Sequence, residues 1–228
     1  MRKLKRNSGS DSLEDPLDDH LSSIKKRALQ KPKLLLEHIR EAYPIGIPAL
    51  SLKSTTDRIG LDAGYSFHLG TAEPELRRIA SWIFTNISQS ENIEDIIGRL
   101  WKRFGREDLV LSSILLANLP RKDGNKNWKW ITLADLIAHV ERRRGRIPLE
   151  VMLLHIEEIS RANCSLMEEE LGQKLLEGTI AERHLGILGL HQLSKKEVLS
   201  NSTKIQLIEI KLPDGDSLIR RIRDKIVE

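Results

Sequence analysis

The sequence predicts an all-α fold in which antiparallel helix pairs stack along one axis, and three observations support this prediction. First, apolar residues recur at the i, i+3, i+4, i+7 spacing of a helical face through most of the chain. Second, residues that start or end helices interrupt this pattern at regular intervals. Third, 39% of the residues are hydrophobic and 31% are charged, which suits thin layers of helices better than a thick sheet core.

The spacing of the expected helices indicates the type of stack. Helix starts are expected near residues 72, 90, 107, 132, 148, 165 and 179. Most are 14 to 18 residues apart, so that two helices recur every 30 to 40 residues. This is the pitch of a solenoid of HEAT-like repeats. A single globular bundle of helices with similar lengths is the alternative, which the spacing leaves open.

Three regions are expected along the 228 residues. Residues 1–20 predict a disordered tail, because a basic start precedes a polar and acidic stretch with few apolar side chains. Residues 21–200 form the helical-repeat domain, interrupted at 43–70 by a long loop that contains aromatic residues, Gly and Pro. Residues 201–228 form an extension in which K-I-Q-L-I-E-I-K-L predicts a β segment. A turn at Pro213–Asp216 follows, and then a second strand or, as we favour, a helix.

Start and stop signals set the limits of several helices. Pro32 and Pro74 suit the first turns of two helices. Gly105 is expected to end the helix that contains Ile93–Phe104, and another helix runs from about Glu107 to Leu119.

Later helix limits follow from capping residues. Thr132 and Asp135 have the spacing of a capping box and predict the start of a helix that ends at Gly145, and Pro148 suits the next start. Three further capping boxes are expected at Ser165–Glu168, Thr179–Glu182 and Ser194–Glu197.

The segment Ile93–Phe104 is the most regular of the predicted helices. Its apolar residues fall on one face, and Trp101 is expected to pack in the core beside them. Basic residues repeat the same spacing on another side of the helix. They are Arg99, Lys102, Arg103 and Arg106. Such a row is either a solvated face or a surface for an anionic partner.

Basic clusters interleaved with tryptophan predict a nucleic-acid surface. The net charge of +4 permits such a partner without requiring it. The candidate binding residues are Arg99, Lys102, Arg103, Arg106, Lys126, Trp128, Lys129, Arg142, Arg143 and Arg144. In a helical repeat, equivalent positions line one side, so these cations would form a track for phosphates. Trp128 and Trp130 lie in a basic segment, where each indole either stacks on a base or packs in the core.

Other function classes lack their motifs. The chain has no phosphate-binding loop, HExxH pair, Rossmann glycine pattern or GxSxG elbow. The seven histidines show no metal-ligand spacing, so we expect no metal and no cofactor. The single cysteine, Cys164, excludes an intramolecular disulfide and fits a reducing compartment. No apolar run approaches the ~18 residues of a membrane span. We therefore expect a cytoplasmic monomer without membrane contact.

Three stretches together resemble the DNA-alkylation-repair family of HEAT-like proteins. They are E-L-R-R-I-A-S-W-I at 75–83, the segment 96–117 with its L-W helix, and the apolar helix pair at 171–191. The resemblance implies a solenoid whose concave basic face holds duplex DNA, and it adds Arg183 to the candidate DNA-binding residues. It also implies a DNA N-glycosylase for alkylated purines, with Asp135 and Trp130 as catalytic candidates. A carboxylate suits this reaction because positive charge develops on the sugar in the transition state.

Two alternatives share the same basic residues. The chain would serve as a non-catalytic scaffold for an acidic protein, with the C-terminal β segment added to the partner's sheet edge. It would equally bind structured RNA along the same cations.

Overall fold

The computed structural model describes residues 15–47, 64–120, 124–145 and 147–228. These ranges contain twelve helices and no strand, which confirms the all-α prediction within them. The helices are α1 (Pro16–Ser23), α2 (Lys26–Leu29), α3 (Pro32–Ala42), α5 (Glu73–Asn86), α6 (Ser90–Arg103), α7 (Arg106–Asn118), α8 (Trp128–Arg144), α9 (Leu149–Arg161), α10 (Glu169–Leu176), α11 (Ile180–Ser194), α12 (Asn201–Glu209) and α13 (Ser217–Val227).

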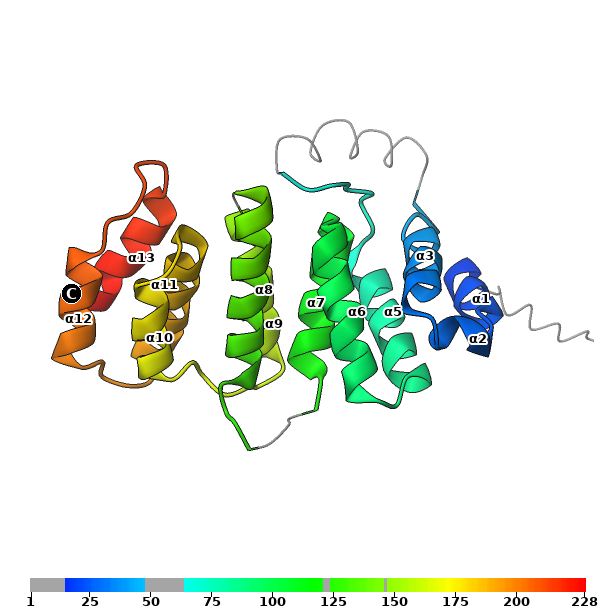
Figure 1. Ribbon diagram of the computed structural model, residues 1–228, viewed down its shortest axis with the longest axis horizontal. Coiled ribbons are helices and arrows are strands. Elements are labelled where there is room, and N and C mark those ends of the chain that lie inside the picture. The colour runs from blue at the N-terminus through cyan, green and yellow to red at the C-terminus, as the bar shows by residue number, and fades with distance from the viewer. Residues whose placement is uncertain (1–14, 48–63, 121–123, 146) are drawn as a thin grey trace, which may run out of the picture.

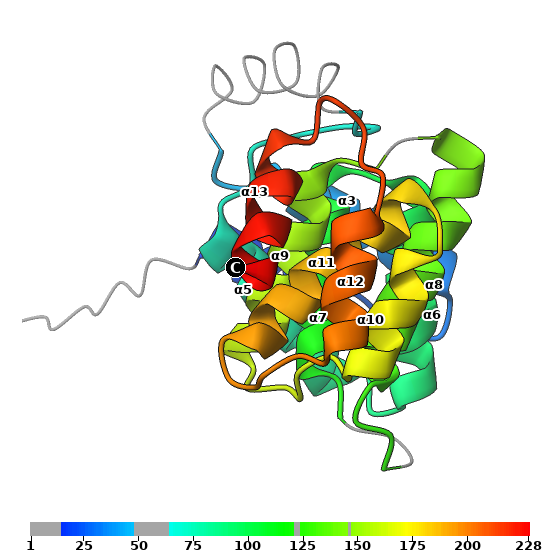
Figure 2. The same ribbon diagram turned by 90° about the vertical axis from the view of Figure 1, so that its left-hand side faces the viewer.

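The helices follow one another along the long axis of the molecule. Figure 1 shows α1 to α3 at one end and α12 and α13 at the other. Figure 2 shows α6, α8 and α10 along one side and α5, α9 and α13 along the other, with α7 and α11 between them. The two outer rows therefore cover a central pair of helices.

The central helices α7 and α11 are buried on every side over most of their length. In α7 every residue from Glu107 to Ala117 is buried, and in α11 every residue from His184 to Leu190 is buried. The segment L-V-L-S-S-I-L-L-A of α7 has no polar stripe, as expected of a helix that is covered all round. Helix α7 packs against α5, α6 and α9, and α11 packs against α8, α10 and α13.

The corner between α6 and α7 depends on a close approach of the loop at residues 64–71. Phe104 ends α6 in the left-handed conformation (φ 60°), and Gly105 follows it. The Phe67 ring lies against Gly105, where a Cβ atom would overlap the ring. Ser66 N–H donates to the Phe104 carbonyl and Arg106 N–H to the Phe67 carbonyl, both at 2.9 Å. Gly105 is therefore required for the contact with Phe67, whereas Phe104, and not the expected glycine, supplies the left-handed residue that ends α6.

The predicted C-terminal β segment is wrong. Most of K-I-Q-L-I-E-I-K-L lies in α12. Ser200 is the N-cap of this helix, and its hydroxyl accepts a hydrogen bond from Thr203 N–H at 3.3 Å. Thr203 and Leu207, four residues apart, are buried on one helical face, whereas Ile205 and Ile208 are exposed. One-sided burial and a good N-cap outweigh the strand propensity of β-branched residues. The predicted turn is confirmed by the Asp216 N–H bond to the Pro213 carbonyl, and the helix after it is α13.

Some of the predicted helix limits are confirmed and others are wrong. The capping box Thr179–Glu182 is confirmed, since each residue's side chain accepts from the other's backbone N–H. The box at Ser194–Glu197 is wrong, because Ser194 ends α11. Helix α8 begins at Trp128, one turn before the expected start at Thr132, so Asp135 lies within the helix rather than at its cap.

The expected boundary of the N-terminal tail at residue 20 falls inside α1. Residues 1–14 lie outside the described ranges, but Pro16–Ser23 is helical and buries Leu17 and Leu21. The Asp15 carboxylate caps this helix by accepting from Leu17 N–H at 2.9 Å. The middle of the loop expected at residues 43–70 likewise lies outside the described part. None of the helices within that part combines the length and the apolarity needed to cross a membrane.

Candidate nucleic-acid interface

A groove between α3 and α6 gathers positive charge. Its volume is about 410 Å³, and we call it the basic groove. It is lined by Lys33, Leu36, Glu37, Arg40, Arg99, Lys102 and Arg103. Five of these seven residues are cations and one is an anion, so the groove suits a ligand with negative charge.

The amphipathic pattern of the two helices places these side chains. Helix α3 buries Leu35, Leu36, Ile39 and Ala42, which leaves Lys33, Glu37 and Arg40 at i, i+4 and i+7 on the opposite side. Helix α6 buries Ile93, Ile96, Ile97, Leu100 and Trp101. The apolar stripe and the core position of Trp101 are thus confirmed. Of the predicted basic row, Arg99, Lys102 and Arg103 line the groove, whereas Arg106 lies in α7.

Three groove cations form no ion pair with other described residues. They are Lys33, Arg40 and Lys102, all of them exposed. The Arg40 guanidinium lies 4.8 Å from the centre of the Phe67 ring, a cation–π contact that leaves its charge uncompensated. Arg99 pairs with Asp95 at 2.7 Å, but both side chains are more than 40% exposed. Such a surface pair contributes little to stability.

Arg103 is committed to the fold instead of the groove. It forms an ion pair with the buried carboxylate of Asp108, and its Nη1 donates to the Leu36 carbonyl at 2.6 Å. The Tyr43 hydroxyl donates to the same carboxylate at 2.9 Å. Burial and the Asp108 charge raise the pKa of Tyr43 well above its ordinary value. Burial alone would lower the pKa of Arg103, but the hydrogen bonds and charge of Asp108 outweigh it and raise that pKa.

The Arg106 side chain is likewise held in an ion pair within the fold. Its Nη2 lies 2.9 Å from the Glu150 carboxylate, which also accepts from the Tyr65 hydroxyl at 2.7 Å. Burial and this hydrogen bond raise the pKa of Tyr65. Burial would raise the pKa of Glu150, but the bonds from Tyr65 and Arg106 hold it below its usual value. Arg106 therefore links α7 to α9.

The C-terminal end of α8 extends the basic surface. Arg142 and Arg143 are exposed and form no ion pair with any described residue. The Arg144 guanidinium lies 4.6 Å from the Phe104 ring centre and donates to the Ser66 hydroxyl at 2.9 Å. Because Phe104 ends α6, this contact brings the arginines of α8 beside the C-terminal end of α6, where Lys102 lies.

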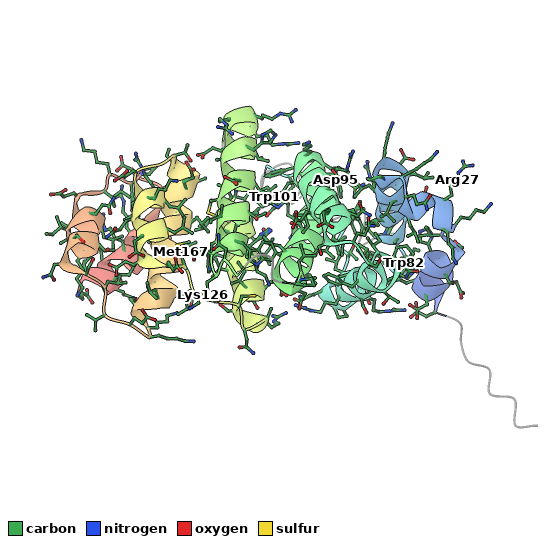
Figure 3. All side chains as sticks on the ribbon, turned by 60° about the horizontal axis from the view of Figure 1, so that its bottom comes forward. Arg27, Trp82, Asp95, Trp101, Lys126 and Met167 are labelled. Atoms are coloured by element: carbon green, nitrogen blue, oxygen red, sulfur yellow. The ribbon has the colours of Figure 1, made fainter. Side chains whose placement is uncertain are left out.

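The other predicted cations lie elsewhere. Lys129 lies 5.5 Å from the Trp128 ring centre, and its ammonium binds the Ala117 carbonyl and the Cys164 sulfur. Lys126 is exposed near the N-terminal end of α8. Helix α8 has 17 residues, so its ends are about 25 Å apart at 1.5 Å per residue. Figure 3 shows Lys126 on the lower side of the view and Asp95 of α6 on the upper side.

The two catalytic candidates are not brought together. The Trp130 side chain is 1% exposed, and its indole N–H donates to the Ser165 carbonyl at 3.0 Å. Asp135 is exposed on the solvent side of α8. Five residues along a helix correspond to a rotation of about 140°. Of the two alternatives for Trp130, stacking on a base or packing in the core, the structure shows packing in the core, and the catalytic role of the two residues stays a prediction.

Arg183 also lies apart from the basic groove. It is partly buried on α11, and its Nη1 lies 3.5 Å from the Lys211 carbonyl.

No family model, curated protein or solved structure matches the chain. The function is therefore inferred from these contacts.

Two groove cations were not among the predicted binding residues. Lys33 and Arg40 share a face of α3 with Glu37, and their spacing of seven residues is visible in the sequence. The sequence does not show that they lie near Lys102, because this proximity depends on the packing of α3 against α6. More unpaired cations precede them on the surface of the described N-terminal helices. They are Lys25, Lys26, Arg27 and Lys31.

Proposed function

We propose that the protein is a HEAT-like helical-repeat protein that binds duplex DNA through the basic groove and the arginines at the end of α8. The observation that carries this proposal is a group of exposed cations in the basic groove and at the end of α8 that have no carboxylate partner in the described ranges. They are Lys33, Arg40, Lys102, Arg142 and Arg143. Cations of this kind bind phosphates and release the counterions condensed on a duplex.

The distribution of aromatic side chains favours a duplex over a single strand. Single-strand binding relies on exposed rings on which bases stack. Trp101 and Trp130 are buried, Trp128 is half-buried beside Lys129, and Phe67 is covered by Arg40. The groove thus offers charge without a stacking platform, and we expect binding to depend on the phosphate backbone and little on sequence.

The serial arrangement of helices supports the HEAT-like part of the proposal. Helices α10 and α11 pack together, as do α12 and α13, and these pairs follow each other along the long axis (Figure 1). A repeat of this type presents equivalent positions on one side, where α6, α8 and α10 lie in Figure 2.

Fluorescence anisotropy with a labelled duplex over a salt series tests the proposal. The interface variant combines Lys102→Glu, Arg142→Glu and Arg143→Glu. The control variant makes the same charge change at three exposed lysines away from α6, α8 and α10, with Lys196→Glu, Lys211→Glu and Lys225→Glu. We expect the interface variant to lose at least tenfold in affinity and the control to keep it.

The salt dependence adds a second readout. If each of the three cations contacts one phosphate, the slope of log K against log salt should become less negative by about 2.7 in the interface variant. Equal losses in both variants would contradict the proposal, because they would reflect net charge alone. Equal competition by polyglutamate of the same charge would instead favour an acidic protein partner, and tighter binding to duplex RNA would favour RNA.

A glycosylase assay tests the catalytic form of the proposal. Duplex containing 7-methylguanine is incubated with the protein and with an Asp135→Asn variant. Because Trp130 is buried and Asp135 lies on another side of α8, we expect no base release above that of the variant. Release that depends on Asp135 would establish the catalytic function.

A further inference from the structure

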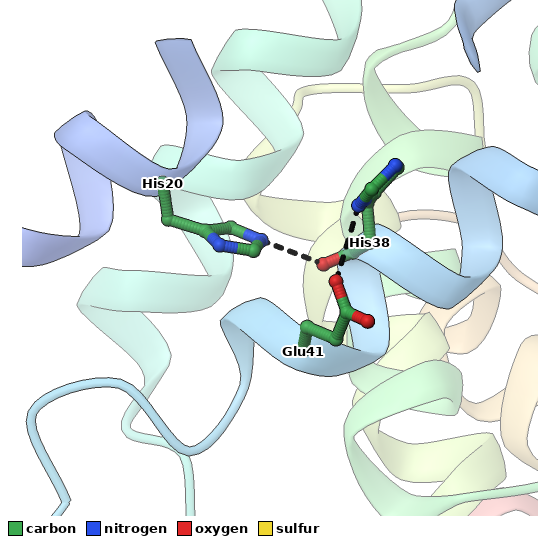
Figure 4. Close-up of side chains that lie close together, drawn as sticks. All are labelled: His20, His38 and Glu41. Atoms are coloured by element: carbon green, nitrogen blue, oxygen red, sulfur yellow. Dashed lines mark hydrogen bonds and ion pairs between the residues drawn. The ribbon is translucent and has the colours of Figure 1, made fainter. Parts of the chain in front are cut away.

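Three side chains with metal-binding atoms meet where α1 packs on α3. His20, His38 and Glu41 each offer one ligand atom, and these atoms lie within 4.8 Å of one another. Figure 4 shows the His20 ring directed from α1 toward the two residues on α3. The His20 Nε2 atom lies 3.0 Å from the His38 carbonyl, and the His38 Nδ1 atom lies 3.1 Å from the Glu41 carboxylate.

The fold positions the three groups independently. His38 and Glu41 are three residues apart on α3, so their side chains project from the same side. On α1, the buried residues Leu17 and Leu21 fix which side of the helix faces α3. His20, adjacent to Leu21, is thereby directed at His38. The two histidines are partly buried and Glu41 is exposed, which leaves room for solvent at the cluster.

We propose that His20, His38 and Glu41 form a binding site for one divalent transition-metal ion, with Zn²⁺ as the best fit. Two imidazoles and one carboxylate are a common zinc ligand set, and a water molecule completes the tetrahedron. Imidazole ligands favour zinc, cobalt, nickel or copper ions over Mg²⁺ and Ca²⁺, which prefer oxygen ligands.

Only small movements are needed to form the site. With metal–ligand bonds of about 2.0–2.1 Å, ligand atoms in a tetrahedral site are about 3.4 Å apart. Ligand atoms that lie within 4.8 Å of one another therefore need to approach by at most about 1.4 Å to bind Zn²⁺. The exposed Glu41 side chain is free to adjust, and each histidine exchanges one hydrogen bond for a bond to the metal.

The ion would tie α1 to α3 and so add to an existing attachment. Helix α1 is already joined to α5 by ion pairs from Arg78 to Asp15 and Asp18, at 2.9 and 2.7 Å. Because a ligand that binds only the folded state stabilises it, Zn²⁺ should raise the Tm. The sequence predicts no metal site because His20 is 18 residues from His38, and only the His-x-x-Glu spacing on α3 is visible.

The test uses the untagged full chain, since a polyhistidine tag would itself bind the metal. Zn²⁺ binding is measured by titration calorimetry, and Co²⁺ is added separately as a spectroscopic probe. We expect one ion per chain and the intense visible bands of four-coordinate Co²⁺. His38→Ala and Glu41→Gln should each weaken binding at least about tenfold, a loss that even indirect changes to a metal site can cause.

His139→Ala is the matched control, because His139 is exposed on α8, remote from the cluster. It should leave affinity and stoichiometry unchanged. Glu41→Gln removes a charge at an exposed position, so it tests the site even if His38→Ala fails to fold by circular dichroism. The proposal is overturned if Zn²⁺ does not saturate one site per chain, or if Glu41→Gln binds as tightly as His139→Ala.

Discussion

Arg103 and Asp108 form a two-point ion pair across the corner between α6 and α7. The Arg103 Nε atom donates to one carboxylate oxygen at 2.7 Å, and Nη2 donates to the other. The Asp108 side chain is fully buried, and that of Arg103 is 20% exposed. A cation that the sequence places in a DNA-binding row therefore holds α6, α7 and α3 together.

Replacing Arg103 should destabilise the protein. In the Arg103→Ala variant the buried Asp108 carboxylate keeps only the Tyr43 hydroxyl and the Gly105 N–H as donors. Removing one partner of a buried pair costs about 3–5 kcal/mol, and the partial exposure of Arg103 suggests the lower end of that range. Urea denaturation measures the loss. Lys102→Ala, at the neighbouring exposed position, should change stability by less than about 0.5 kcal/mol. Equal effects of the two substitutions would show that the ion pair does not stabilise the corner.

This contrast marks the limit of what periodicity reveals. The sequence predicts the amphipathic helix, its buried face and Trp101 at its core, and all three are confirmed. It does not separate Arg103 from Lys102, because both lie in the same basic row. Their difference arises from Asp108, which becomes a buried partner only when Gly105 turns the chain into α7.

Long-range packing also accounts for the wrongly predicted β segment near the C-terminus and for the wrongly predicted start of α8. Strand propensity in K-I-Q-L-I-E-I-K-L is local, whereas the helical state depends on burying Thr203 and Leu207. Trp130 lies among lysines in the sequence, but it is buried because α8 begins at Trp128. The capping signal at Thr132 predicts a later start for this helix. Local signals thus predict where helices are, and long-range packing decides which polar and aromatic residues remain available.

The two tryptophans at the start of α8 should contribute unequally to the stability of the protein. Trp130→Ala removes a buried indole and its hydrogen bond to Ser165, and should cost about 3–5 kcal/mol. Trp128→Ala removes a half-buried ring and should cost clearly less. Thermal and urea denaturation compare the variants. A small loss for Trp130→Ala would show that this indole is not a core residue and would reopen its proposed contact with DNA.

Gly105 should not tolerate a side chain. Its Cβ would overlap the Phe67 ring, and overpacking of this kind costs about 1–3 kcal/mol. Gly98 of α6 is the matched control, because a Cβ there meets nothing within 4 Å. Gly98→Ala should therefore stabilise the protein by about 0.5–1 kcal/mol. Adding Phe67→Ala to Gly105→Ala should cost less than the two single losses added together. Additive losses in this double-mutant cycle would contradict the proposed contact.

His155 should make the stability of the protein depend on pH. Its ring is buried against Trp101, with ring centres 5.2 Å apart. Nδ1 lies 2.7 Å from the Val151 carbonyl and must carry a proton, because that oxygen only accepts. Nε2 lies 3.2 Å from the Ser112 hydroxyl. Burial lowers the pKa of His155 to about 4, although the bond to Val151 opposes this shift.

The direction of the effect follows from proton linkage. Above a pH of about 6.5 the imidazole is neutral in both states, so its contribution to stability is complete. As the pH falls from about 6.5 to about 4, the unfolded chain binds a proton that the folded chain excludes, and stability falls by about 3 kcal/mol. Urea denaturation at several pH values should show this slope. His155→Leu should flatten it, leaving a smaller dependence from His68 and His191, whose pKa values are also lowered by burial. An unchanged slope in His155→Leu would mean that this histidine is not held neutral by the fold.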